Sequence, residues 1–517
     1  MKIEISENEY WWGCTSYSYK DCKSPFSKED EFEFDLRIQA LNQTAPLMLS
    51  SQGRYIISDS PFAYKVSGGV IEITAGEVTL VKAGETLKDA YLDASKNYFP
   101  FEERTIPDKF FTVPQYNTWM QFTYDPTEEG VLKYAQDIID NGFEPGILMI
   151  DEGWHTRYGI WEFDKAKFPH PKETMDKLHD MGFKVMLWVV PYVTPDGKYF
   201  ATSVSAVHDP IHCKDRYVRN DKGAVMYFAW WNGISALLNL DGETDNREFN
   251  EKLKFLMEEY GVDGFKFDGA NASSLGRNNQ RHGIANANFD AHKCSMAYNE
   301  FGKKYEYHEF KDTYNMGGKS IAERLCDRNH TWEGQGLASI IPMALRAGLL
   351  GYPYICPDMV GGGQWTIREL HTDKFDAELF VRTAQASALF PMMQFSWAPW
   401  EALNEEYLSY VKKAADLHAQ MAETFIELAD NAAKTGEPIM RSLEYVDPHK
   451  NYAEINDEFM LGNDILVAPV LKKGAVSRTV IFPKGRWQDQ NTGKIYEGNT
   501  EAEVEADLST LPWFRRV

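Results

Sequence analysis

The sequence predicts an α/β protein in which a (β/α)8 barrel (a TIM barrel) is flanked by N-terminal and C-terminal β-sandwich domains. Three observations carry this prediction. In the middle of the chain, short apolar runs alternate with amphipathic stretches, the pattern of repeated βα units. At both ends, short runs rich in β-branched and aromatic residues are broken by Gly, Ser and Asp, as in antiparallel sheets. The length of 517 residues also suits about three domains.

The changes of pattern place the domain boundaries. We expect residues 1–105 to form the N-terminal β-sandwich, residues 106–435 the barrel and residues 436–517 the C-terminal β-sandwich. The segment 191–235 is too long for an ordinary loop between a strand and a helix, so it is interpreted as an insertion near the active site.

Eight runs within the middle region are candidate barrel strands. They are residues 116–119, 146–151, 184–190, 263–268, 305–310, 320–327, 353–358 and 389–395. Helical stretches such as EEGVLKYAQDIIDNG and KETMDKLHDMG lie between them, and each ends at a glycine that can adopt the left-handed stop conformation.

Charge and composition exclude several classes of partner. The 54 basic and 77 acidic residues give a formal net charge of −23, which repels nucleic acids and anionic membranes, so neither is expected as a partner. No apolar run approaches the roughly 18 residues of a membrane span. The N-terminus shows no signal peptide and the cysteines are scattered, so a cytoplasmic, reducing location is expected.

No motif indicates a cofactor. The sequence lacks HExxH, a GxGxxG motif after a strand and GxxxxGK[ST], so no metal, dinucleotide or nucleotide is expected. Aromatic residues make up 14% of the chain. This excess is typical of sugar-binding clefts, although a tryptophan-rich core is the commoner explanation.

Four candidate strands end in an acid, at Asp151, Asp268, Asp327 and Asp358. Barrel enzymes place their catalytic groups at the carboxyl ends of strands. One such acid is more often a ligand, a helix cap or a loop ion pair than a catalyst. Four acids on one rim without metal-ligand histidines favour glycoside chemistry, in which one carboxylate attacks and another carboxyl group protonates the leaving oxygen.

Two of these acids have the features of a catalytic pair. Lys266 and Asp268 are two residues apart on a strand, so both point into the barrel mouth, where the ammonium would keep a nucleophile ionised. A purely structural Lys–Asp pair fits the spacing equally well. Asp327 is the candidate general acid, with a pKa raised by burial or by Asp268. Its alternative role is to cap a helix beginning near Thr331.

The motif IDEGW places Asp151, Glu152 and Trp154 together after the second strand. Two acids beside a tryptophan suit a hexose, because carboxylates accept hydrogen bonds from hydroxyl groups and the indole stacks on C–H bonds. Trp230 and Trp231 in the long insertion form a second candidate platform. Each tryptophan alone is more often a core residue.

The chain resembles glycoside hydrolase family 31, a family of retaining α-glycosidases, over essentially its whole length. The stretch WEFDKAKFPHPKETMDKLHDMGFKVMLWVVPYV is similar to the family's third barrel strand, and GVDGFKFDGAN is similar to its nucleophile strand. FMLGNDILVAPVLKKGAVSRTVIFPKGRW resembles its C-terminal sandwich. The resemblance implies a small oligosaccharide or other α-glycoside as substrate.

The same motifs imply roles for single residues. Asp268 of KFD would be the nucleophile, and Asp327, five residues before Trp332, would be the acid/base. Asp151 and Asp358 match the sugar-binding aspartates after the second and seventh strands.

Four segments resemble the branch that contains the animal myogenesis-regulating glycosidase and bacterial α-galactosidases. They are WWNGIS, DRNHTW, LGYPYICPDMVGG and FPMMQFSWAPW. This likeness implies an exo-acting α-galactosidase that releases terminal non-reducing galactose. Asp151, Glu152 and Asp358 are expected to contact O4 and O6 of the sugar, with Trp231 as the pocket wall.

Three positions depart from the family pattern. Ser396 stands where α-glucosidases keep a histidine near the eighth strand, which argues against glucose. Lys311 replaces an arginine that lies sixteen residues before the acid/base, and Arg324 is the candidate substitute. Asn271 replaces a glutamate found in many members. The N-terminal domain is short for the family, so completion of the cleft by a homo-oligomer partner stays open.

Other functions remain compatible with these residues. An α-glucosidase, an α-xylosidase or a hydrolase for a modified hexose would use the same fold and the same pair of acids. A catalytically silent sugar-binding barrel would have lost one carboxylate, and neither is lost here. Transglycosylation would need no other residues, and the sequence predicts neither the linkage nor the aglycone.

Overall fold

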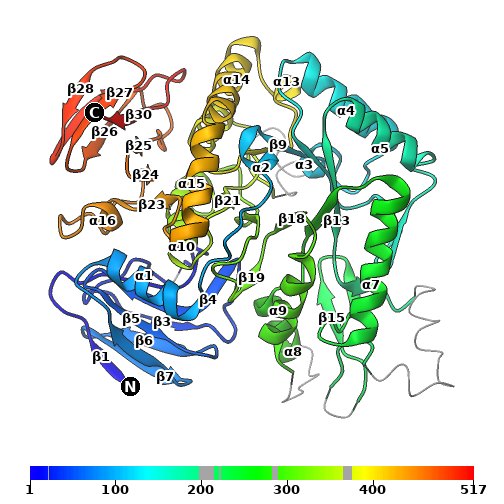
Figure 1. Ribbon diagram of the computed structural model, residues 1–517, viewed down its shortest axis with the longest axis horizontal. Helices are drawn as coiled ribbons and strands as arrows, with labels where there is room; N and C mark the ends of the chain where they lie inside the picture. Colours follow the sequence, from blue (N-terminus) through cyan, green and yellow to red (C-terminus); the bar gives the residue numbers. More distant parts are fainter. Residues whose placement is uncertain (21, 197–214, 221–222, 282–288, 365–374) are drawn as a thin grey trace.

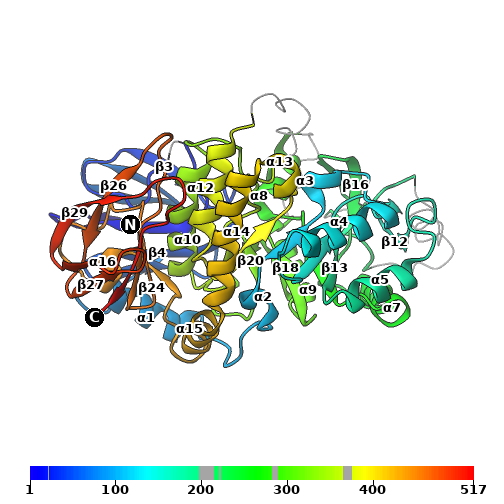
Figure 2. The ribbon, with the colours of Figure 1, turned by 90° about the horizontal axis from the view of Figure 1, so that it is seen from above.

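The computed structural model describes residues 1–20, 22–196, 215–220, 223–281, 289–364 and 375–517. The chain forms a barrel with two β-rich parts on one side of it, one from each end of the chain (Figure 1). The view from above shows the same arrangement, with the N-terminal and C-terminal sheets close together and the barrel beside them (Figure 2).

The barrel is an eight-stranded parallel sheet, so the predicted fold class is confirmed. Its strand order is β21-β20-β18-β17-β13-β10-β9-β22, and a parallel bridge between Met359 and Gln394 joins the two ends. Seven of the predicted strands contain one observed strand each, and the predicted strand 116–119 overlaps β9, which begins one residue earlier. The observed strands are β9 (Gln115–Asn117), β10 (Ile147–Ile150), β13 (Lys184–Val189), β17 (Gly264–Phe267), β18 (Tyr307–Phe310), β20 (Glu323–Arg324), β21 (Ile355–Cys356) and β22 (Gln394–Phe395).

Amphipathic helices cover the outside of the barrel, as the sequence pattern predicts. In α4 (Glu128–Asp140), the Thr127 side chain caps the first turn by accepting a hydrogen bond from Gly130 N, and residues three to four positions apart are buried. The other principal helices are α5 (Pro171–Asp180), α7 (Glu243–Phe255), α9 (Ala291–Gly302), α10 (Ile340–Leu349), α12 (Ala377–Ser387), α14 (Glu405–Gln420) and α15 (Ala422–Thr435).

The N-terminal region contains two sheets and the helix α1 (Leu87–Tyr98). One sheet has the order β1-β7-β6-β3, from Lys2–Glu4, Val70–Ala75, Ala63–Ser67 and Phe32–Asp35. The other sheet has the order β19-β4-β5-β8, from Thr313–Tyr314, Gln43–Ser50, Arg54–Ile57 and Thr79–Lys82. A fifth strand, β2 (Trp11–Thr15), also pairs with β4. The strand β19 comes from the barrel segment between β18 and β20. The N-terminal sheet therefore includes a strand that lies between two barrel strands in the sequence, although the two sheets are separate.

Hydrogen bonds reinforce this junction. Asn42 Nδ2 and Gln43 Nε2 both donate to the backbone carbonyl of Lys311, at 2.9 and 3.1 Å. The backbone N–H of Asn42 donates to Asp312 Oδ1 at 2.7 Å. The N-terminal region thus fixes the backbone just beyond the carboxyl end of β18.

The C-terminal region has a sheet of order β23-β24-β25-β30-β27-β28 and a two-stranded antiparallel sheet of β26 and β29. The strands are Met440–Arg441, Phe459–Leu461, Ile465–Val467, Trp513–Arg516, Arg486–Asp489, Ile495–Glu497, Ser477–Phe482 and Thr500–Glu505. Trp487, Phe482 and Phe514 lie in its separate apolar core. Arg382 of α12 joins it to the barrel by donating to the carbonyl groups of Ala475 and Ala506, at 3.0 and 2.9 Å.

The expected insertion is described only in part. Its strands β14 (Tyr192–Val193), β15 (Tyr227–Trp230) and β16 (Gly233–Leu237) form a small antiparallel sheet. Residues 197–214 and 221–222 of this insertion lie outside the described residues.

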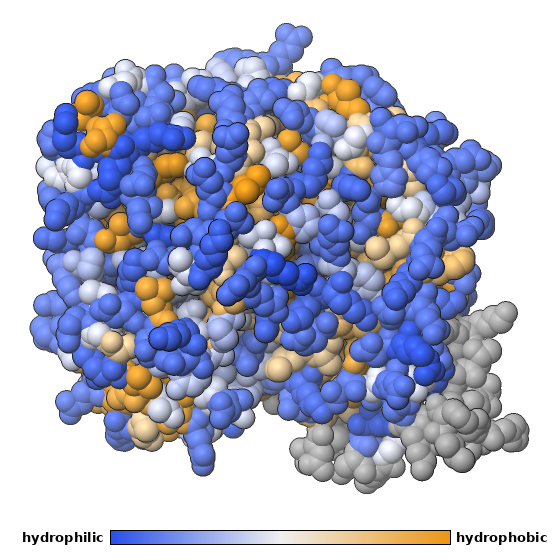
Figure 3. Space-filling model, viewed as in Figure 1, coloured by the Kyte–Doolittle hydropathy of each residue, from blue (hydrophilic) through white to orange (hydrophobic). Residues whose placement is uncertain are grey.

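The surface is predominantly hydrophilic. Figure 3 shows charged and polar residues over most of one face, with hydrophobic residues scattered among them. Within the described part of the chain, no helix has the length and apolar character that a membrane crossing requires.

Candidate active site

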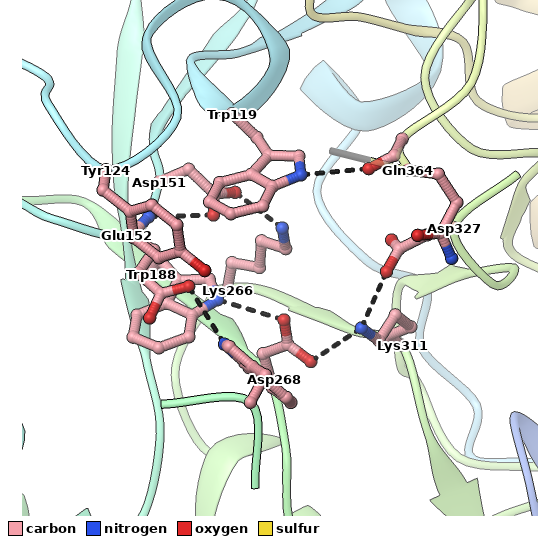
Figure 4. A pocket seen from close by; sticks show the side chains of 12 residues that line it. Trp119, Tyr124, Asp151, Glu152, Trp188, Lys266, Asp268, Lys311, Asp327 and Gln364 are labelled. Atoms are coloured by element: carbon pink, nitrogen blue, oxygen red, sulfur yellow. Dashed lines mark hydrogen bonds and ion pairs between the residues drawn. The ribbon is translucent and has the colours of Figure 1, made fainter. Parts of the chain in front are cut away.

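A cavity of about 200 Å³ opens at the mouth of the barrel. Its walls come from residues at or just beyond the carboxyl ends of most barrel strands, together with the β15–β16 turn. They are Trp119, Tyr124, Asp151, Glu152, Trp188, Trp231, Lys266, Asp268, Lys311, Asp327, Gly363 and Gln364 (Figure 4). The position agrees with the general rule for barrel enzymes.

Asp268 is a buried carboxylate held on both oxygens. Trp188 Nε1 donates to its Oδ2 at 3.0 Å, and the backbone N–H of Gly269 donates to its Oδ1 at 2.7 Å. Lys311 Nζ lies 3.1 Å from the same Oδ1. Burial alone would raise the pKa of Asp268, but the charges of Lys311, Lys266 and Arg324 hold it well below its usual range. The side chain is therefore ionised at neutral pH, as a nucleophile requires.

Lys266 lines the cavity beside Asp268, but its direct partner is Asp151. Its Nζ lies 2.6 Å from Asp151 Oδ2, and both side chains are almost fully buried. The other oxygen of Asp151 accepts a hydrogen bond from the backbone N–H of Glu152 at 2.8 Å. The spacing of Lys266 and Asp268 suggested an ion pair between these two residues. The lysine that contacts Asp268 is instead Lys311.

Asp327 faces Asp268 across the ammonium group of Lys311. Lys311 Nζ donates to its Oδ2 at 3.2 Å, and Arg324 Nη1 lies 2.9 Å from its Oδ1. Although burial would raise the pKa of Asp327, Lys311 and Arg324 lower it below its ordinary value. The expectation of a raised pKa for Asp327 is therefore wrong. Asp327 is also not a helix cap, because the next helical turn begins at Leu337.

Glu152 joins the barrel to two surface hairpins. Tyr158 donates to its Oε1 at 2.5 Å, Trp231 Nε1 donates to its Oε2 at 3.2 Å, and the side chain of Asn232 also donates to Oε1. Burial, with smaller contributions from the charges of Asp151 and Asp268, raises the pKa of Glu152 to about 7, although the bonds from Tyr158 and Trp231 oppose this shift. Trp231 is thereby held at the cavity wall, where the sequence places it.

Arg324 and Asp358 lie behind the cavity wall. Arg324 has a 1% exposed side chain and makes ion pairs with both Asp358 and Asp327. Asp358 Oδ2 accepts hydrogen bonds from the backbone N–H groups of Arg328 and Gly363, at 2.8 and 2.9 Å, and its side chain is fully buried. Neither residue is among those that line the cavity. They orient Asp327 and the loop after β21.

Trp154 is a core residue rather than a sugar platform. Its side chain is fully buried, and its Nε1 donates to the carbonyl of Trp188 at 2.8 Å. The aromatic wall is instead formed by Trp119, Tyr124 and Trp188, together with Trp231. Trp119 ends a predicted strand and Trp188 lies two residues before the end of another, so the strand-end rule applied to the acids points to both of them. No comparable signal marks Tyr124.

Two of the three departures from the family pattern do not reach the cavity. Ser396 is fully buried, and its hydroxyl accepts a hydrogen bond from the backbone N–H of Met120 at 2.7 Å. Asn271 accepts a hydrogen bond from the backbone N–H of Ser274 at 2.8 Å, at the start of the helix α8 (Ala272–Arg281). None of the described residues that line the cavity comes from β22. The departure that does shape the cavity is Lys311.

The described residues contain no group of three or more His, Cys, Asp or Glu side chains that could hold a metal ion. The chemistry available from the cavity residues is that of carboxyl groups, ammonium groups and indole N–H donors.

Two family profiles match this chain. The profile described as "Glycosyl hydrolases family 31 TIM-barrel domain" matches residues 112–428, and "Glycosyl hydrolase family 31 C-terminal domain" matches residues 436–517. The chain is 32% identical over 431 residues to the myogenesis-regulating glycosidase of Mus musculus, covering 81% of this chain and 58% of the relative. It is 27% identical over 423 residues to α-glucosidase 2 of Bacillus thermoamyloliquefaciens, covering 76% and 51%. The chain thus spans little more than half the length of these relatives.

Solved structures show the same fold. A family 31 dextranase from Flavobacterium johnsoniae, complexed with glucose, has a TM-score of 0.83 at 19% identity; the match covers all of this chain and 66% of the dextranase. A family 31 α-xylosidase from a soil metagenome, complexed with xylose, has a TM-score of 0.77 at 19% identity, with coverage of 100% and 80%.

The buried Glu152 predicts a pH-dependent effect on stability. A carboxyl group with a raised pKa in the folded state binds more protons there than when unfolded, so its contribution to stability falls as pH rises from 4.5 to about 7. In Glu152→Gln this loss is absent. The melting temperature of the variant relative to wild type should therefore rise across this interval.

Thermal melts at several pH values measure this difference, with Glu129→Gln on the exposed start of α4 as the control. A difference between Glu152→Gln and wild type that stays constant with pH would contradict the role given to burial.

Proposed function

Because this chain belongs to glycoside hydrolase family 31, we propose that it is a retaining, exo-acting α-glycosidase. The observation that carries the proposal is the position of Lys311 between Asp268 and Asp327. The contacts of 3.1 and 3.2 Å limit the separation of the two carboxylate oxygens to about 6.3 Å, whereas inverting pairs are roughly 6.5–9.5 Å apart and retaining pairs roughly 5–5.5 Å apart.

The reaction then proceeds in two displacements. In the first, a carboxylate oxygen of Asp268 bonds to the anomeric carbon, the glycosidic C–O bond breaks, and the proton of Asp327 passes to the leaving oxygen. In the second, Asp327 removes a proton from water, the water oxygen bonds to the anomeric carbon, and the ester bond to Asp268 breaks. Two inversions at the anomeric carbon leave its configuration unchanged.

The shape of the cavity supports action on a terminal sugar. Its volume of about 200 Å³ suits one sugar ring rather than a long chain, and Trp119, Tyr124 and Trp231 form much of its wall. Trp231 is 49% exposed, so it leaves part of its ring for the group that follows the bound sugar. The deeper wall contains the charged groups that meet hydroxyl groups and the anomeric centre.

We further propose that the terminal sugar is α-galactose. The support is the likeness of four segments to the galactose-cleaving branch, and the buried position of Ser396 where α-glucosidases have a histidine. Galactose differs from glucose in its axial O4. Asp151 and Glu152 are the carboxyl groups placed to hydrogen-bond this hydroxyl. The sequence also predicts this contact for Asp358, but its side chain is fully buried and is not part of the proposal. A site whose polar groups hydrogen-bond the axial O4 of galactose leaves those buried groups without a partner when glucose binds.

The second candidate is an α-glucosidase or α-xylosidase, the activities for which several relatives are named. These activities would use Asp268 and Asp327 in the same way. Transglycosylation differs only in the acceptor, because a sugar hydroxyl would replace water in the second displacement.

Substitution of the acid/base tests the mechanism. In Asp327→Ala, glycosides with poor leaving groups should lose about 10²–10⁴-fold in kcat/KM, while activated aryl glycosides should lose far less, because a good leaving group needs little protonation. Added azide should accelerate the variant on activated substrates and give an α-glycosyl azide, since the small anion needs no general base. Glu333→Ala, an exposed acid in the same loop, is the control and should behave as wild type. Equal losses on both substrate classes would reject the acid/base role.

A panel of nitrophenyl α-glycosides tests the sugar. The kcat/KM for the α-galactoside should exceed that for the α-glucoside by orders of magnitude. The α-xyloside, which lacks the C6 hydroxymethyl group, should also be poor. A preference for the glucoside or the xyloside would overturn the galactose assignment while leaving the catalytic pair untouched.

A further inference from the structure

Lys311 combines a fixed backbone with an ammonium group that has two equivalent partners. Its carbonyl is held by Asn42 and Gln43 of the N-terminal region, at 2.9 and 3.1 Å. Its Nζ lies 3.1 Å from Asp268 Oδ1 and 3.2 Å from Asp327 Oδ2 (Figure 4). Small rotations about the side-chain bonds would therefore favour one carboxylate over the other without moving the backbone.

The other cations near Asp327 lack this freedom. Arg324 is 1% exposed and is shared between Asp327 and the buried Asp358. Lys266 is paired with Asp151 at 2.6 Å. Within the described part of the chain, the ion pairs of Lys311 are those with Asp268 and Asp327, the two groups that exchange charge during the reaction.

The double displacement moves one negative charge between these two carboxyl groups. Before the attack, Asp268 is a carboxylate and Asp327 carries the proton. After the ester has formed, Asp268 is uncharged and Asp327 is the carboxylate. The pair therefore carries one negative charge at each stage, which one ammonium group can neutralise.

We propose that Lys311 is a positioning residue that shifts its ion pair from Asp268 to Asp327 as the glycosyl-enzyme forms, and so sets which carboxyl group holds the proton at each stage. This inference rests on the proposed function. Before the attack, Lys311 pairs with Asp268, and its bond to Asp327 Oδ2 lengthens so that this oxygen can be protonated. After the attack, Lys311 pairs with Asp327 and stabilises the carboxylate that deprotonates water.

Several groups besides Lys311 act on Asp327, and they stay in place in the test. Arg324 contacts it directly, while Asp268 and Lys266 act through space. Asp358 lies behind Arg324, and Asp312 follows Lys311 in the chain. The ring of Trp231 faces the ammonium group of Lys311, with 5.7 Å between Nζ and the ring centroid, and so acts on Lys311 itself. Comparing variants that differ only at position 311 separates its charge from this background.

The first experiment needs no substrate. The Asp327 carboxyl is titrated by ¹³C NMR in the full chain labelled at the aspartate carboxyl carbons, and its signal is assigned by its absence in Asp327→Asn. In Lys311→Met, which keeps the length of the side chain but removes its charge, Asp327 should titrate about 1–3 pH units higher than in wild type. Lys311→Arg keeps the charge and should shift it much less. The same titration in Lys311→Met and wild type would overturn the proposal.

The second experiment follows the reaction. On an activated aryl glycoside, hydrolysis of the glycosyl-enzyme limits kcat, and the acidic limb of kcat against pH reports Asp327 in that intermediate. Lys311→Met should move this limb upward by about 1–3 pH units, and Lys311→Arg should leave it near its wild-type position. A lysine that only bound the sugar would change KM and leave the limb in place, which would reject the proposal. If the wild-type enzyme cleaves no α-glycoside, the proposed function is rejected. The NMR titration would still show whether the charge of Lys311 controls protonation of Asp327.

Discussion

The balance of buried charge at the barrel mouth is the constraint on which this site depends. Asp151, Asp268, Asp327 and Asp358 face three cations, Lys266, Lys311 and Arg324, and most of these side chains are almost completely buried. An unpaired buried charge costs several kcal/mol, so each carboxylate keeps its charge only while its cation is in place, and loss of one partner typically costs about 3–5 kcal/mol. The same pairs hold the side chains in fixed positions before a substrate arrives. Stability and orientation at this site therefore have one physical cause.

The fold supplies this balance through strand register and through the N-terminal region. Parallel pairing sets Lys266 beside Trp188 of β13 on one side and Glu309 of β18 on the other, which directs the ammonium and the indole toward the same end of the barrel. The N-terminal sheet takes β19 as one of its own strands, and Asn42 and Gln43 fix the carbonyl of Lys311. The N-terminal region thus helps to build the candidate active site. Its contribution is to hold the cation that lies between the two central carboxylates.

The sequence predicts the barrel well, because apolar strands that alternate with amphipathic helices produce a strong local signal. It also brings Asp151, Asp268 and Asp327 to one cavity, since strand ends share a rim. It fails where a side chain's role depends on partners distant in sequence. Trp154 and Asp358 follow strands as cavity residues would, yet Trp154 donates to the carbonyl of Trp188 and Asp358 is enclosed by Arg324 and two backbone N–H groups. The spacing of Lys266 and Asp268 could not show that Lys266 pairs with Asp151 across the barrel.

The proposed mechanism requires that Asp268 attacks the anomeric carbon of an α-glycoside. Trapping of the covalent intermediate is the decisive test of this role of Asp268. The full chain is incubated with a 5-fluoro-α-glycosyl fluoride of its preferred sugar and then digested. The labelled peptide is sequenced by mass spectrometry. We expect one sugar per chain, attached to Asp268, and protection from labelling by an excess of substrate. A sugar attached to Asp327 or Asp151, or an unlabelled enzyme that releases product of inverted configuration, would contradict it.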